Sequence, residues 1–152
     1  MQLTLHADYA LRVLLYLGSH PDRVVSTQEI SKGYGISKHH LVRVVRRLSE
    51  AGYVNITAGR YGGVALARDP AQIRIGDVVR STETNLAVVE CFDMKTNTCI
   101  IAPVCHLKGV LQDALQGFLA VLDRYTLADL MGRGAAQRLA LVFDRRLRHS
   151  SA

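Results

Sequence analysis

The three cysteines of the 152-residue sequence lie close together, at Cys91, Cys99 and Cys105. Their C-x7-C-x5-C spacing matches neither a zinc knuckle nor a ferredoxin motif, but three thiolates can hold zinc or an iron–sulfur cluster when a fourth donor completes the site. Structural cysteines usually occur singly on apolar faces, so the grouping favours a metal centre over a thiol redox switch or inert thiols. Residues 83–105 show little helical periodicity, and we expect a cysteine loop that holds this metal centre.

A second group of residues with binding chemistry is basic and falls on one predicted helix. Four apolar residues have the spacing of a single buried helix face, namely Leu41, Val44, Val45 and Leu48. Six basic residues occupy the other faces, namely Lys38, His39, His40, Arg43, Arg46 and Arg47. On the second helix of a helix-turn-helix, such side chains meet base edges and phosphates. We therefore expect these residues, with Ser37 at the start of the helix, to bind DNA.

The preceding segment predicts the first helix of that motif. Ser26-Thr27-Gln28-Glu29 has the pattern of a capping box, in which the Ser26 hydroxyl and the Glu29 carboxylate each satisfy a backbone N–H. Val25 and Ile30 are placed as a hydrophobic staple, and Ser37 repeats the capping device one helix later. Gly33-Tyr34-Gly35 is the tight connection between the two helices. The pattern predicts a helix-turn-helix that includes Ser26, Thr27 and Gln28.

A β-hairpin is predicted next. Residues 52–57 and 64–67 read as strands, and residues 58–63, with three glycines, read as the turn. Arg60 and Tyr61 at the tip are placed to touch the DNA backbone or minor groove. A helix over Leu5 to Ser19 precedes the motif, and another near Gly76 to Thr82 follows it. The expected fold is mainly α with a small β-hairpin wing, a winged helix-turn-helix domain over residues 1–82.

Composition and charge agree with a polyanion partner. Nineteen Lys and Arg against thirteen Asp and Glu give a net charge of +6, and residues 1–80 hold eleven of the bases against six of the acids. No apolar run approaches the roughly 18 residues of a membrane span, and no export signal opens the chain, so we expect a cytoplasmic protein. The sequence contains no Ser/His/Asp arrangement and no phosphate-cradling glycine loop, so we do not expect an enzyme.

The C-terminal half predicts a dimerisation helix followed by a tail. A helix over about residues 104–125 carries apolar residues in alternating threes and fours, at Leu107, Leu111, Ala114, Leu115, Phe118, Leu122 and Tyr125. That spacing is typical of a coiled-coil-like seam, and we expect residues 106–131 to form a homodimer interface. A twofold dimer would present two recognition helices to an inverted-repeat operator. Residues 132–152 should hold a helix and a frayed basic end, Arg145-Arg146-Leu147-Arg148, to which we assign no function.

Several segments resemble one known family. The run GRYGGVALARDPAQIRIGDVVRSTE is similar to the wing and following helix of the Rrf-two (Rrf2) family of winged-helix regulators. The opening MQLTLHADYALRVLLYL, the cysteine loop and CHLKGVLQDALQGFLAVLDRYTLADL resemble its nitric-oxide-sensing NsrR branch. The likeness covers about residues 1–131. It implies a homodimeric transcriptional repressor with one iron–sulfur cluster per subunit, which releases DNA when nitric oxide nitrosylates the cluster.

The resemblance also implies a set of cluster ligands. The family's cysteine ligands correspond in order to Cys91, Cys99 and Cys105. The seven residues between the first two cysteines make a longer spacing than in some members of the family. The fourth ligand would be Asp8 from the other subunit, with His6 and His106 as alternatives. A [4Fe-4S] cluster is favoured, and [2Fe-2S] stays open. The alternatives are a thiol- or zinc-dependent winged-helix regulator, an iron–sulfur regulator of another branch (cluster assembly or redox sensing), and an iron–sulfur electron carrier.

Overall fold

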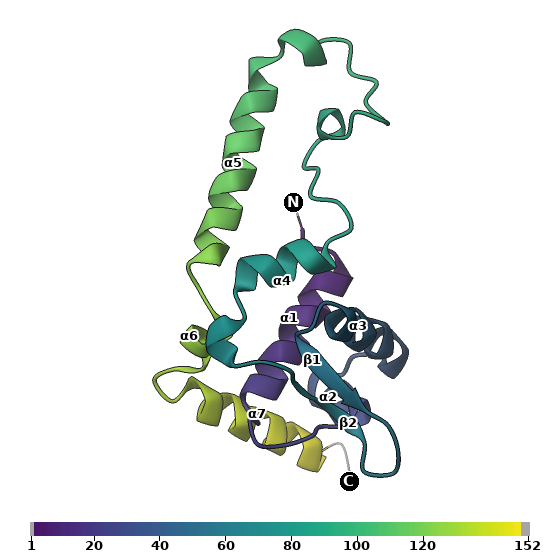
Figure 1. Cartoon of the computed structure of the whole chain (residues 1–152), viewed down its shortest axis with the longest axis vertical. Helices are drawn as coiled ribbons and strands as arrows, with labels where there is room; N and C mark the ends of the chain where they lie inside the picture. The colour runs from purple at the N-terminus through teal and green to yellow at the C-terminus, as the bar shows by residue number, and fades with distance from the viewer. Residues whose placement is uncertain (1, 150–152) are drawn as a thin grey trace.

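The computed structural model describes residues 2–149 and has two parts (Figure 1). A body of helices and one hairpin lies below, and a long helix with a loop beside it projects upward from that body. The elements in chain order are α1 (Leu5–Gly18), α2 (Thr27–Tyr34), α3 (Lys38–Glu50), β1 (Val54–Thr57), β2 (Gly63–Leu66), α4 (Ile75–Thr82), α5 (His106–Asp123), α6 (Leu127–Met131) and α7 (Ala135–His149). The expected class, mainly α with a small hairpin, is confirmed.

Helix α1 runs through the middle of the body and contributes more residues to its core than any other element. It begins at Thr4, whose hydroxyl accepts a hydrogen bond from the Ala7 amide at 3.2 Å. Its apolar side chains are almost fully buried, namely Ala10, Val13, Leu14 and Leu17. The buried face of α3 joins the same core through Leu41, Val44, Val45 and Leu48, as the helical spacing predicted.

Two of the expected helix caps differ from the prediction. The Ser26 hydroxyl accepts a hydrogen bond from the Glu29 amide at 3.0 Å, which is half of a capping box. The Glu29 carboxylate instead accepts hydrogen bonds from the Tyr16 hydroxyl of α1 and from the guanidinium of Arg23, in the loop that follows α1. Ser37 occupies the N-cap position of α3, but its side chain makes no capping hydrogen bond. The turn between α2 and α3 is closed by Gly35 in the left-handed conformation, with φ of 68°.

The hairpin is antiparallel; its first strand is shorter than the predicted 52–57, and its second strand begins one residue before the predicted 64–67. Its register pairs Val54 with Leu66 and Thr57 with Gly63. An isolated bridge between Val25 and Val64 ties the hairpin to the segment that leads into α2, and both side chains are buried. The wing therefore shares the core of the helix-turn-helix.

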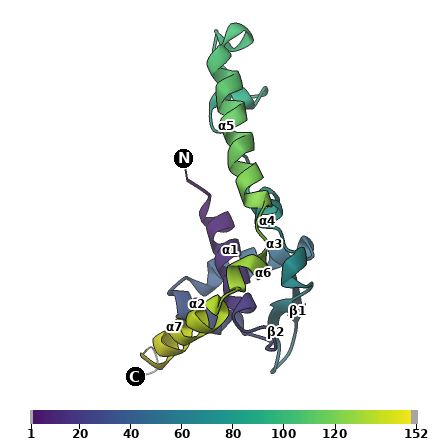
Figure 2. The same cartoon turned by 90° about the vertical axis from the view of Figure 1, so that its left-hand side faces the viewer.

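Helix α5 stands clear of the body in both views (Figures 1 and 2). It begins at His106, after a 3₁₀ turn at Ala102–Val104, so the expected start at residue 104 was slightly early. At its base, the Arg80 guanidinium of α4 donates two hydrogen bonds to the Asp123 carboxylate, at 2.6 and 2.7 Å. This pairing lowers the pKa of Asp123. A Cβ at Gly76 would collide with the same carboxylate, so close approach of α4 and α5 requires glycine there.

The C-terminal segment is helical and docked, so the expected frayed end was wrong for the part of the chain that the structure describes. Helix α7 extends to His149 and lies against α2 (Figures 1 and 2). Its Phe143 is 4% exposed, with ring centroids 4.5 Å from Tyr16 and 4.9 Å from Tyr34. Phe143 thus adds an aromatic cluster beneath α2. Residues 150–152 of the predicted tail lie outside the described residues.

Candidate nucleic-acid interface and cysteine loop

Helix α3 presents its basic residues to solvent. Lys38, His39, His40, Arg43, Arg46 and Arg47 are all exposed, whereas the apolar face of α3 is buried against α1. Ser37, immediately before the helix, is also exposed. This is the arrangement that a recognition helix needs, because the body holds the helix while its charged faces stay available to a partner.

Two of these arginines make contacts within the chain. The Arg46 guanidinium pairs with Glu50 one turn later, at 3.1 Å. Arg47 Nε donates to the carbonyl of Ser81 at 3.0 Å, and so joins α3 to the last turn of α4. The Arg47 contact spans 34 residues of sequence, and no local pattern in the sequence indicated it.

His6 is a further residue of this surface. It lines an open depression of about 540 Å³ together with Arg43, Arg46 and Arg47 of α3 and with Glu83, which follows α4. Partial burial, and then the positive charges of Arg43 and Arg47, lower the pKa of His6 below its ordinary value. The start of α1 therefore lies beside the recognition helix, a proximity that the sequence did not reveal.

The remaining expected DNA-contacting residues occupy the first helix and the wing. Ser26 and Gln28, at the start of α2, are exposed, and Thr27 is half-buried. At the wing tip Tyr61 is 88% exposed, and the Arg60 guanidinium lies 5.8 Å from the centre of its ring. Both side chains can therefore reach a partner beyond the body.

The three cysteines lie in the projecting part and form no disulfide. Cys91 is in a 3₁₀ turn at Glu90–Phe92, Cys99 follows an Asn97 turn, and Cys105 directly precedes α5. All three thiols are half-buried. Among residues 2–149, however, no three His, Cys, Asp or Glu side chains are grouped as a metal site. The structure of one chain thus does not bring the predicted ligands together.

The three candidates for a fourth ligand lie at different places. Asp8, in the first turn of α1, forms a two-pronged ion pair with Arg12, with N–O distances of 2.8 and 3.0 Å. Its side chain is 37% exposed. His6 lies beside α3, as described above, and His106 is an exposed residue at the start of α5. Asp8 is therefore accessible to a second molecule, although Arg12 already neutralises its charge.

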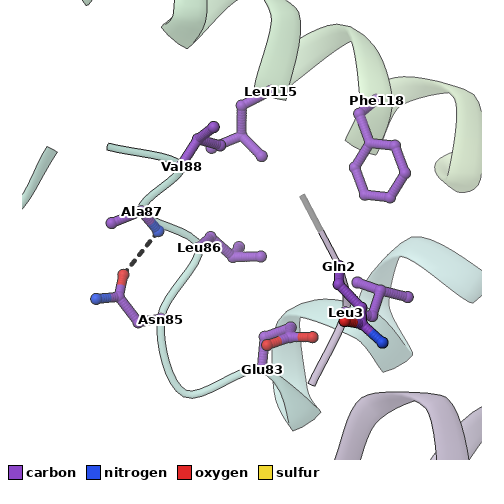
Figure 3. A pocket seen from close by; sticks show the side chains of 9 residues that line it. All are labelled: Gln2, Leu3, Glu83, Asn85, Leu86, Ala87, Val88, Leu115 and Phe118. Carbon is purple, nitrogen blue, oxygen red and sulfur yellow. Dashed lines mark hydrogen bonds between the residues drawn. The ribbon is translucent and has the colours of Figure 1, made fainter. Parts of the chain in front are cut away.

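An apolar cavity lies between the base of the cysteine loop and α5 (Figure 3). Its volume is about 240 Å³, and its apolar lining includes Leu3, Leu86, Val88, Leu115 and Phe118. Just below it, Glu83 accepts a hydrogen bond from the Thr4 amide at 2.8 Å. The N-terminal arm and the loop base are thus joined at the cavity.

The outer part of α5 is apolar and uncovered. Leu107 and Val110 are each 61% exposed, and Val121 is 44% exposed. Within this helix, Leu119 is the one residue that the structure describes as buried. Exposed apolar surface of this extent on a helix is typical of an interaction face.

The wing, the α2–α3 helix pair and the exposed basic face of α3 define a winged helix-turn-helix protein that binds DNA. A family model described as "Iron-dependent Transcriptional regulator", Rrf2, matches residues 3–133. The chain belongs to the Rrf2 family of transcriptional regulators. None of the helices in residues 2–149 has the length and apolar character that a membrane crossing requires.

Curated relatives and solved structures agree with this assignment. The HTH-type transcriptional regulator NsrR of Bacillus subtilis (strain 168) is 50% identical over 86% of this chain and 90% of the relative. NsrR of Geobacillus kaustophilus (strain HTA426) is 48% identical over 96% of this chain and 99% of the relative. Among solved structures, T. potens IscR has a TM-score of 0.69 at 28% identity, covering 86% of both chains. CymR of B. subtilis has a TM-score of 0.65 at 28% identity, covering 86% of this chain and 95% of that one. The expected similarity to NsrR-type regulators is confirmed.

Proposed function

We propose that this chain is a homodimeric transcriptional repressor that senses nitric oxide through an iron–sulfur cluster in each subunit. Cys91, Cys99 and Cys105 would hold the cluster, and Asp8 of the partner subunit would supply the fourth ligand. The observation that carries the proposal is the combination in one chain of an exposed basic α3 with all three cysteines on one projecting loop. The similarity to NsrR regulators over most of the chain supports the same reading.

The exposed face of α5 supports a dimer. Leu107, Val110 and Val121 would cost solvation free energy if they stayed in water, and a second copy of the same helix would cover them. A twofold pair of α5 helices would give the dimer two α3 helices, one for each half of an inverted repeat. In this proposal, residues 1–82 form the DNA-binding domain, residues 83–105 form the loop that binds the cluster, and residues 106–131 form the dimer interface.

The chemistry of the donors fits an iron–sulfur cluster. Three thiols on one half-buried loop are soft ligands of the kind that iron–sulfur clusters take, and a carboxylate is a harder ligand for one iron. Because the three thiols are not grouped within residues 2–149 of one chain, the loop would have to fold around the cluster, and Asp8 of the partner subunit would supply the fourth donor. When bound, the cluster would supply the iron with which nitric oxide reacts. We favour [4Fe-4S] over [2Fe-2S].

The contacts of the loop base suggest how the site affects DNA binding. Asp8 must leave Arg12 to act as a ligand, and it lies on the helix whose first amides are capped by Thr4. The Thr4 amide in turn donates to Glu83, at the beginning of the cysteine loop. Two residues earlier, the Ser81 carbonyl holds Arg47 of α3. We infer that this chain of contacts transmits a displacement of the loop base to the recognition helix.

Anaerobic purification tests the cofactor. We expect a coloured protein with iron and inorganic sulfide, both lost in Cys99→Ala. Asp8→Ala should weaken cluster retention or abolish the response to nitric oxide, whereas Asp22→Ala, which removes an exposed loop carboxylate, should not. Full cluster content and response in Asp8→Ala would contradict the ligand assignment.

Footprinting of the anaerobic protein on a promoter fragment that it binds tests the switch. We expect protection that disappears when nitric oxide is added, because the two states must differ in DNA affinity by several kcal/mol to shift occupancy strongly. Equal protection with and without nitric oxide would overturn the sensing proposal. A colourless protein containing zinc would favour the zinc-dependent alternative.

A further inference from the structure

We propose that the C-terminal end of α7 is an additional DNA-contacting element, in which Arg145 and Arg148 bind backbone phosphates beside the half-site occupied by α3. The inference rests on DNA binding by the helix-turn-helix. It concerns a helix that begins at Ala135, after the last residue of the family match at 133.

Helix α7 is held against the first helix of the helix-turn-helix. Phe143 anchors the helix beneath α2 through its contacts with Tyr16 and Tyr34. Toward the end of the helix, Leu147 shares a surface hollow with Ser26 and Lys32 of the α2 region. The last two turns of α7 are therefore held along the first helix of the motif and cannot swing away while Phe143 stays docked.

The C-terminal end of α7 also contacts the turn between α2 and α3. The Arg146 guanidinium lies 3.3 Å from the position that a Cβ on Gly35 would occupy. Gly35 ends α2 and is separated from the start of α3 by two residues. The tip of α7 thus lies beside both the start of α2 and the turn that leads into the recognition helix.

The C-terminal end of α7 is strongly basic. The end of α7 holds Arg145, Arg146, Arg148 and His149, and within residues 140–149 the single acid is Asp144. Arg145 and Arg148 are exposed and stand one helical turn apart, so they share one side of the helix. Lys32 is also exposed, and it lines the same hollow as Leu147 of α7. Glu29, the nearby acid of α2, is already neutralised by Arg23.

Helix-turn-helix proteins dock on DNA in a known orientation, which indicates what the end of α7 would contact. The first helix of the motif crosses the sugar–phosphate backbone while the second lies in the major groove. A basic helix end held beside the first helix would therefore meet phosphates and not base edges. Such contacts add affinity without sequence preference and increase the dependence of binding on salt.

Salt-dependent binding of the full-length protein to a fluorescent 30-base-pair duplex of arbitrary sequence tests the proposal. For Arg145→Gln/Arg148→Gln, each lost phosphate contact should reduce the slope of log K against log salt by about 0.9, so by about 1.8 per bound subunit. Over the tenfold range from 1 M to 0.1 M salt, that slope change corresponds to about 60-fold in affinity. Arg145→Lys/Arg148→Lys keeps both charges and should retain most of the slope.

Matched controls separate this inference from the function on which it rests. Arg124→Gln/Arg138→Gln removes two exposed charges from the base of α5 and the start of α7, and its slope should equal that of the wild type. Arg43→Gln on α3 should weaken binding. If Arg43→Gln weakens binding but the Arg145/Arg148 variant binds like the control, the α7 contact is wrong and the helix-turn-helix assignment stands. If the wild type shows no salt-dependent binding, both are wrong.

Discussion

Replacing Phe143 by alanine should detach α7 from the body. Phe143 is 4% exposed and fills the space between the rings of Tyr16 and Tyr34. Truncation of a buried phenylalanine costs about 3–5 kcal/mol, and because α7 is peripheral and can move away, we expect a loss near the lower end, about 3 kcal/mol. In a chain of this length that loss lowers Tm by roughly 6–12 °C.

Urea unfolding followed by circular dichroism measures the change, and hydrogen exchange of the α7 amides shows where it occurs. We expect protection to fall in α7 and to persist in α1. Leu141→Ala, on the outer face of the same helix and 63% exposed, is the matched control and should change stability by less than about 0.5 kcal/mol. A loss below about 1 kcal/mol for Phe143→Ala, with α7 still protected, would refute the anchoring role.

Three further substitutions test the arm, the aromatic cluster and the dimer. Asp123→Asn should loosen the base of α5 and speed proteolysis of the projecting part at neutral pH. Because Arg80 lowers the pKa of Asp123, the wild type should lose the Arg80–Asp123 ion pair only when acid protonates the carboxylate. An Asn variant as resistant to protease as the wild type would contradict this role of the ion pair. Tyr34→Phe removes a 3.0 Å hydrogen bond to a backbone carbonyl and should cost about 1 kcal/mol in thermal unfolding. Since burial raises the pKa of Tyr34 to about 12, the stabilisation from its protonated phenol should be complete below pH 10 and fade between pH 10 and 12, a loss that the phenylalanine variant should lack. Leu107→Asp should shift sedimentation from dimer to monomer, whereas Gln116→Asp should not, and an unchanged dimer would argue against the α5 interface.

Local sequence patterns predicted the helix-turn-helix and the wing well. Helical spacing placed Leu41 and Leu48 in the core because a helix embedded on one face must repeat apolar residues every three or four positions. The Ser26 cap of α2 could also be predicted from the sequence, because the amide that donates to its hydroxyl is only three residues away. The Glu29 carboxylate was misassigned, since its actual donors reach it through the tertiary fold, one of them from Tyr16.

The candidate site was harder to predict because its geometry depends on distant contacts. The sequence indicated which thiols have ligand chemistry, but spacing alone says nothing about how a loop without regular structure folds. The link from Arg47 to Ser81 and the docking of Phe143 each join segments far apart in the chain, and neither has a local pattern. The tail was therefore expected to fray, although its buried phenylalanine holds it in place.

In the proposed dimer, the two-pronged contact between Arg80 and Asp123 would control how accurately the two recognition helices are spaced on DNA. Helix α5 has 18 residues and so acts as a lever about 27 Å long, attached to the body only at one end. A tilt of about 7° at that pivot would carry the far end through roughly 3.4 Å, the rise of one base pair in DNA. An arginine fork that grips a carboxylate at two points resists such rotation better than the single point charge of a lysine. In a pair of molecules joined through their levers, the stiffness of this pivot would decide whether two bodies stay in phase with the double helix.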